Sequence, residues 1–213
     1  MFQKSFGTSG VNAIGSFQLS QLNSSSVQSK LKAAGINTNS KQYKAAVKQM
    51  MSAGNGAMYG NIQGIKNLMS HYDKDGDYIN PVNGLAGLLV TDDNENSRRR
   101  IISIPDSSKE EMYELTKKEF LRENGVCNGD TTKRTDVYNN LYRKMSKKDR
   151  LAAGYTLEKY ERIYRQAFYD AAKKADPNWE IGKPIKDGAL DSVTRETAES
   201  GKSPAQATLD TKI

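Results

Sequence analysis

Acidic residues are absent from the first third of this chain. No Asp or Glu occurs before residue 73, while residues 1–72 hold seven lysines and no arginine. Residues 73–213 hold 25 basic and 25 acidic residues, so the net charge of +7 comes from the first third. Those lysines are spaced among Ser, Gln and Asn, with no aromatic stacking pattern between them. We interpret the segment as a solvated basic surface, and keep a weak basic nucleic-acid binder as the alternative.

Cysteine, histidine and long apolar runs are also scarce. The single cysteine, Cys127, excludes an internal disulfide, and a nucleophilic role for it would require the single histidine, His71, as its base. No apolar run approaches the ~20 residues that cross a bilayer, and the first residues lack the apolar core of a secretory signal. We therefore expect no membrane segment, and a protein that is cytoplasmic or exported without a cleavable signal peptide.

Catalytic motifs are missing too. The glycine-containing stretch AGNGAMYGN lacks the spacing and the following Lys-Ser/Thr of a phosphate-binding loop. Paired acids such as Glu110 and Glu111 stand where a helix begins, and the helix dipole explains them there. The sequence therefore predicts that the protein is not an enzyme.

Hydrophobic residues make up 36% of the chain and the mean hydropathy is -0.75, so we expect a moderate helical core with unpacked ends. Composition predicts a disordered leader rich in Ser, Gly and Gln at 1–23, one helical domain at 24–186, and a flexible tail at 187–213. The leader, without acids, resembles the unstructured starts of flagellar-type export substrates.

Apolar residues repeat at helical spacing in most of the central region. The pattern predicts a mainly α fold of about six helices, at 25–34, 40–53, 57–72, from 108 to before Gly125, from 131 onward, and from a Thr156 cap to Asp176. In the last of these, Tyr160, Tyr164 and Phe168 are expected to face the core. Gly35 is expected to cap the first helix in the left-handed conformation.

Two short apolar runs, 88–90 and 101–104, flank the polar segment TDDNENS. They can pair as a small β-hairpin near 88–104, although runs of this length are ambiguous between strand and helix. Arg98–Arg100 follow the same segment. They fit either an anion site or a solvated turn beside its acidic residues.

The one segment with recognisable chemistry is HYDKDGDYINPVNG, which follows a predicted helix. Asp73, Asp75 and Asp77 alternate as do ligands 1, 3 and 5 of a helix–loop–helix calcium loop, and the carbonyl of Ile79 fits position 7. Three carboxylates at this spacing repel one another unless a cation lies between them. The predicted metal ligands are Asp73, Asp75, Asp77, Ile79 and Asn80, and the predicted cofactor is calcium.

The loop 73–84 resembles a degenerate EF-hand loop. Tyr78 stands where the EF-hand has glycine, Gly84 stands where it has the bidentate glutamate, and no second helix obviously follows. These departures imply a weak site. The alternative is an acidic turn in which the aspartates cap backbone amides and bind nothing.

Three further segments resemble a family of uncharacterised bacterial proteins, a domain of unknown function. They are KAAVKQMMSAGNGAMYGNIQGIKNLMSHYDKDGDYINP, RRRIISIPDSSKEEMYELTKKEF and GDTTKRTDVYNNLYRKM. The resemblance implies that the acidic loop belongs to the module. It implies no activity for this chain, because no activity is established for the family. The sequence thus favours a non-enzymatic helical module that binds calcium and presents a surface to a protein partner. A structural or exported protein without metal is the alternative.

Overall fold

The computed structural model describes residues 16–53, 59–92, 94–126 and 131–200. These residues form seven α-helices, two short 3₁₀ helices and one two-stranded sheet, so the predicted mainly α class is confirmed. No helix among them has the length and hydropathy needed to cross a membrane. By its contacts the chain divides into two compact units, residues 1–89 and 90–213, and each is described by itself. The predictions for 1–15, Cys127 and 201–213 lie outside the described residues.

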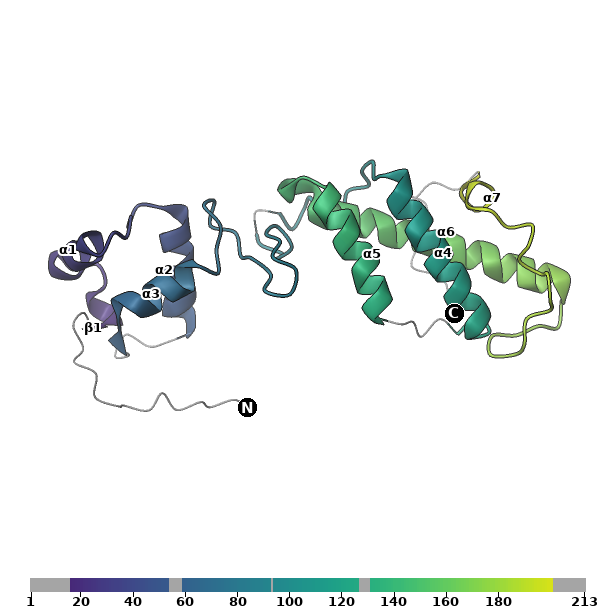
Figure 1. Ribbon diagram of the computed structural model, residues 1–213, viewed down its shortest axis with the longest axis horizontal. Coiled ribbons are helices and arrows are strands. Elements are labelled where there is room, and N and C mark those ends of the chain that lie inside the picture. The colour runs from purple at the N-terminus through teal and green to yellow at the C-terminus, as the bar shows by residue number, and fades with distance from the viewer. Residues whose placement is uncertain (1–15, 54–58, 93, 127–130, 201–213) are drawn as a thin grey trace. The chain divides into compact units, whose positions relative to one another are not determined.

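The first unit folds around a small, largely aliphatic core. Its elements are β1 (Phe17–Gln18), η1 (Leu19–Gln21), α1 (Ser25–Ala33), α2 (Lys41–Ala53), β2 (Tyr59–Gly60) and α3 (Ile62–Met69). The strands pair antiparallel, and α2 packs on α3 (Figure 1). Gly35 follows α1 with φ +78°, as the sequence predicts. The buried residues of this core are Phe17, Leu19, Leu22, Val27, Leu31, Ile36, Tyr43 and Ile65.

The second unit is built on three long helices. Its elements are α4 (Asp106–Arg122), α5 (Thr131–Lys144), η2 (Lys147–Asp149), α6 (Arg150–Ala175) and α7 (Arg195–Glu199). The long helix α6 contacts α4, α5 and α7 (Figure 1). Aromatic rings fill much of its core: Phe168 lies 5.5 Å from Tyr113 and 5.7 Å from Phe120 between ring centres. Tyr164 and Phe168 are fully buried and Tyr160 packs against them, as the helical period predicts.

The predicted hairpin near 88–104 is wrong. Residues 88–104, apart from the undescribed 93, contain no strand. Instead, the amides of Glu95 and Arg98 donate to the carbonyls of Thr91 and Asn94, which makes a series of turns. Ile104 is buried and Ile102 packs against the same helical core. Burial against helices, rather than pairing between strands, therefore accounts for the second apolar run.

Folded structure extends beyond both predicted ends of the domain. Phe17, Leu19 and Leu22 of the predicted leader are at most 4% exposed, because they complete the core beneath α1. At the other end, α7 belongs to the predicted tail. The Tyr113 hydroxyl donates to the Val193 carbonyl at 2.5 Å, and the Tyr164 hydroxyl donates to Glu199 at 2.7 Å. Isolated apolar residues in polar segments leave no periodic signal, so composition places both boundaries too far inward.

Several helix boundaries also differ from the predicted ones. The last long helix begins at Arg150, so Thr156 is not its cap. The Thr156 hydroxyl is buried within the helix, where it donates to the Ala152 carbonyl at 2.8 Å and accepts the Ile102 amide at 3.1 Å. The third helix spans 62–69 rather than 57–72, and Asn61 caps it by accepting the Gly64 amide at 2.7 Å.

Candidate metal centre

The acidic loop is anchored where α3 ends. The side-chain amide of Gln42, on α2, donates to the carbonyls of Met69 at 2.9 Å and Tyr72 at 2.7 Å. Met69 is the last residue of α3 and its carbonyl also accepts the Tyr72 amide at 3.0 Å, so Gln42 is a second donor at this helix end. Tyr72, directly before the loop, is thereby held to a second helix of the same unit.

The backbone of the loop closes on itself around Asp73. Its amide donates to the Asp77 carbonyl at 2.9 Å, and its carbonyl accepts the Gly76 amide at 3.0 Å. Its carboxylate oxygen Oδ1 accepts the amides of Asp75 and Asp77, each at 2.9 Å. A short acidic side chain that accepts amides two and four residues on fixes a tight turn.

Gly76 supplies the strained position of this turn. Its φ is +86°, and a Cβ placed on it would lie 3.0 Å from the carbonyl oxygen of Lys41 at the start of α2. The left-handed residue therefore lies two positions before Tyr78, where an EF-hand has its glycine. Tyr78 instead forms a bridge with Tyr72, and their rings meet edge to face with centres 5.9 Å apart. Burial, and then the neighbouring Tyr78, raise the pKa of Tyr72.

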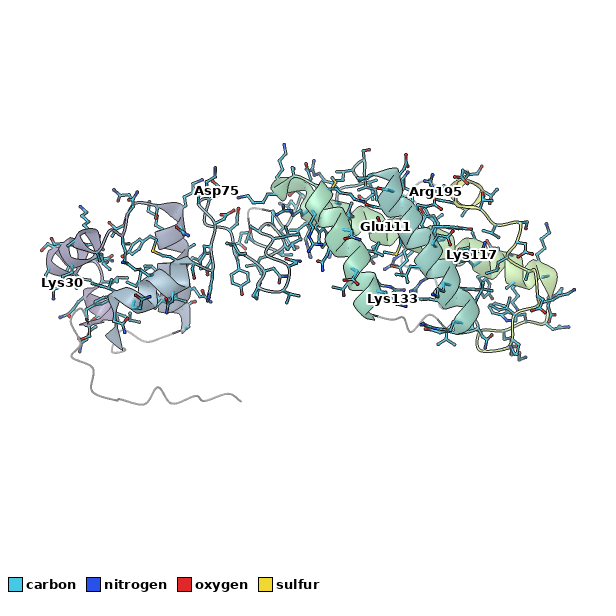
Figure 2. All side chains as sticks on the ribbon, in the orientation of Figure 1. Lys30, Asp75, Glu111, Lys117, Lys133 and Arg195 are labelled. Carbon is cyan, nitrogen blue, oxygen red and sulfur yellow. The ribbon has the colours of Figure 1, made fainter. Side chains whose placement is uncertain are left out.

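This turn brings the three predicted carboxylates together. One side-chain oxygen from each of Asp73, Asp75 and Asp77 lies within 4.8 Å of the others, and the group can hold a metal ion. Asp75 is exposed and lies on the loop (Figure 2), while Asp73 and Asp77 are half-buried. One oxygen of Asp73 already accepts the amides of the turn, so the same cluster is a structural turn and a candidate cation site.

The other two predicted ligands lie just beyond the group. Ile79 donates its amide to the His71 carbonyl at 2.8 Å and forms a bridge with Ala86. The side-chain oxygen of Asn80 accepts the Val82 amide at 2.9 Å, so it organises the next turn. Ligation by Ile79 and Asn80 stays a prediction. His71 lies directly before the loop, as the sequence indicates.

Gln42 and Lys41 are the contributors that sequence reasoning missed. Both stand about 30 residues before the loop, at the start of α2, and they act on it by hydrogen bonding and backbone packing. A glutamine near a helix start has no local signature for capping another helix. Only the packing of α2 on α3 could reveal its role.

The family of this chain can now be stated. No curated protein and no solved structure matches the chain. Residues 36–213 match the model of a domain of unknown function, DUF3879, and the match includes the acidic loop, α2 to α7 and the core of the second unit. The chain therefore belongs to the DUF3879 family.

Proposed function

We propose that this protein is a non-catalytic helical module that binds one calcium ion in the loop 73–84. We propose also that the first unit, which contains this loop, presents a surface to a protein partner. The observation that carries the proposal is the approach of three carboxylate oxygens, from Asp73, Asp75 and Asp77, to within 4.8 Å of one another. Oxygen ligands converging on one point are what a hard divalent cation requires.

Calcium suits the loop better than magnesium. Calcium accepts 6–8 oxygens in flexible geometry, whereas magnesium demands a near-ideal octahedron and retains several waters. The Ile79 carbonyl, an Asn80 oxygen and water complete the set around the three aspartates. Because Gly84 stands where a bidentate glutamate would be, the affinity falls in the range of ~10⁻⁴–10⁻³ M that weak extracellular-type modules show.

Binding would stabilise more than the loop. The cation offsets the repulsion among the three carboxylates, and Gln42 links Tyr72, directly before the loop, to α2. Calcium is thus expected to stabilise the α2–α3 pair as a unit and to fix the surface beside it. Two exposed apolar residues of the same unit can contribute to a contact: Val82 within the loop, 83% exposed, and Met51 on α2, 43% exposed.

The test is a thermal melt of the full chain, first in excess chelator and then in about 10 mM Ca²⁺ or Mg²⁺. At ten to one hundred times the dissociation constant, calcium should add about 1.4–2.7 kcal/mol to the free energy of unfolding. The Asp75→Asn, Asp77→Asn variant should lose this gain. It keeps Asp73, whose carboxylate holds the turn.

A matched control carries the same loss of two charges elsewhere: Asp92→Asn with Asp136→Asn, both exposed. It should respond to calcium like the unaltered chain. Two results would exclude the loop as a calcium site. Either calcium shifts the thermal midpoint equally in both double variants, or it shifts the midpoint of neither the unaltered chain nor the variants.

The partner and the location have separate tests. Cross-linking in whole cells, with the unaltered chain compared with Val82→Ser, should give a calcium-dependent adduct that the variant lacks. The location remains cytoplasmic or exported without a cleavable signal peptide. A weak site would be filled outside a cell, where calcium is high, so fractionation of culture supernatant decides whether calcium is a constant ligand or a rare one.

A further inference from the structure

A second charged site, independent of the calcium loop, lies within the second unit. A cavity of about 520 Å³ opens between Val90, Arg98 and Arg99 on one side and the helices α5 and α6 on the other. This volume falls within the ~300–1,000 Å³ typical of small-molecule pockets. Its polar lining includes Arg98, Arg99, Lys159 and Arg162, and its aromatic lining includes Tyr138 and Tyr142.

Helical spacing places much of this lining on two faces. Tyr155, Glu158, Lys159 and Arg162 stand at i, i+3, i+4 and i+7 along α6, so they share one side of that helix. Tyr138 and Tyr142 stand four apart on α5, and their ring centres are 6.0 Å apart. The arginines of the turn complete the wall, so three separate segments build the pocket.

The charge of the pocket is positive. Among the described lining residues the carboxylate is Glu158, which pairs with Arg162 at 2.5 Å, and Glu95, outside the lining, pairs with Arg98 at 2.8 Å. Arg99 is exposed and has no ion pair among the described residues. Among the described lining residues, the guanidinium groups of Arg98, Arg99 and Arg162 thus stand beside one carboxylate, Glu158. Because residues 73–213 carry equal numbers of acidic and basic residues, this excess is local to the pocket.

The tyrosines add aromatic surface without charge. Tyr138 and Tyr142 are neutral at physiological pH, as an ordinary phenol also is, and burial raises the pKa of both further. Lys159 is only 7% exposed, and its Nζ lies 5.2 Å from the centre of the Tyr155 ring, a cation–π contact. Aromatic surface and fixed positive charge therefore occur side by side.

We propose that this pocket binds a small phosphate ester that carries a planar ring, the chemical class of a mononucleotide. Arg98, Arg99 and Arg162 supply guanidinium groups, whose planar donors match phosphate oxygens. The tyrosine-lined wall offers a surface for the ring, since stacking on aromatic side chains is how proteins hold bases without reading sequence. The cavity is too large for phosphate alone and of the right size for the ester.

The experiment is isothermal titration of the full chain, at low salt and with chelator so that calcium cannot bridge phosphate to the loop. The probes are AMP, adenosine and inorganic phosphate, each up to about 1 mM. AMP should bind saturably and more tightly than either fragment. Arg99→Gln should weaken AMP about tenfold, which is 1.4 kcal/mol. Arg99 is exposed and unpaired among the described residues, so this variant should keep the thermal midpoint of the unaltered chain.

The control is Arg143→Gln, which removes the same charge from an exposed residue on α5 that does not line the pocket. It should leave AMP binding unchanged. Absence of AMP binding would overturn the proposal, as would equal weakening by both variants, which would mean diffuse electrostatics. Phosphate that binds as tightly as AMP would overturn the role of the ring.

Discussion

The loop 73–84 and the pocket on α5 and α6 are both concentrations of charge, but they are built in different ways. The loop draws three carboxylates from five consecutive residues, and their own backbone turn brings them together. The cations of the pocket come from a turn and from α6, and its tyrosines come from both α5 and α6. A site of the first kind can be recognised in the sequence, whereas a site of the second kind exists only after helices have packed.

The two units that hold these sites also differ in their cores. Aliphatic side chains dominate the first, while the second has a continuous set of rings that includes Tyr113, Phe120, Tyr164, Phe168 and Trp179. Aromatic side chains bury more apolar area each, and their contacts add about 0.5–1.5 kcal/mol per pair. We therefore expect the second unit to be the more stable one, and the pocket to be more rigid than the loop.

The largest expected effect is a loss of stability in the second unit that leaves the stability of the first unit unchanged. Phe168→Ala removes a fully buried ring that contacts Tyr113 and Phe120, and should lower the free energy of unfolding by about 3–5 kcal/mol. Denaturant unfolding with residue-resolved hydrogen exchange should show the loss confined to residues 90–213. If the calcium response of the loop disappears with it, the two units are not independent, and the comparison fails.

The next test acts on the loop. Gly76→Ala should cost about 2–4 kcal/mol in the first unit, because an alanine there meets both a left-handed φ and the Lys41 carbonyl. Gly84→Ala is the matched control: its φ is +71°, but nothing lies within 4 Å of the added Cβ, so about 1–2 kcal/mol is expected. Equal losses in thermal melts would mean that the contact with α2 does not matter.

A third test sharpens the case for the pocket. A Cβ on Gly154 would lie 2.6 Å from the Tyr142 hydroxyl, so Gly154→Ala should displace that ring, cost about 1–3 kcal/mol and weaken AMP binding. In a Tyr142→Phe background the hydroxyl is gone but ring carbons remain at 3.1 and 3.3 Å from the added Cβ, so the same alanine should cost clearly less than in the unaltered chain. A double-mutant cycle measured by denaturant unfolding gives the coupling, and additive losses would contradict the contact.

The smallest effect is a dependence on alkaline pH. Burial keeps the folded-state pKa of Tyr138 above its unfolded value of about 10. Its contribution to stability is therefore complete below pH 10 and is lost as pH rises toward the folded pKa, by about 1.4 kcal/mol per pH unit. Tyr138→Phe should flatten the fall in stability above pH 10, followed by ultraviolet absorbance and urea unfolding. An unchanged slope would show that this phenol titrates alike in both states.

Local patterns allowed much of the helical content to be predicted. Tyr164 and Phe168 repeat at the period of a helix, and Gly35 follows α1 with the left-handed conformation that a glycine cap requires. The approach of Asp73, Asp75 and Asp77 also follows from their spacing. A single turn can bring side chains together when they are so close in the sequence. Helix starts were less predictable: Thr156 has the chemistry of a cap, yet its hydroxyl bonds within α6 and to Ile102.

The sequence by itself thus determined the helical class and the acidic loop, because both depend on interactions among residues within a few positions of one another. Only the tertiary structure decided the rest: the fold of residues 17–22 and 195–199, the Gln42 anchor and the pocket of arginines and tyrosines. Each of these joins segments tens of residues apart, and its free energy comes from burial and pairing that exist only once the helices have packed.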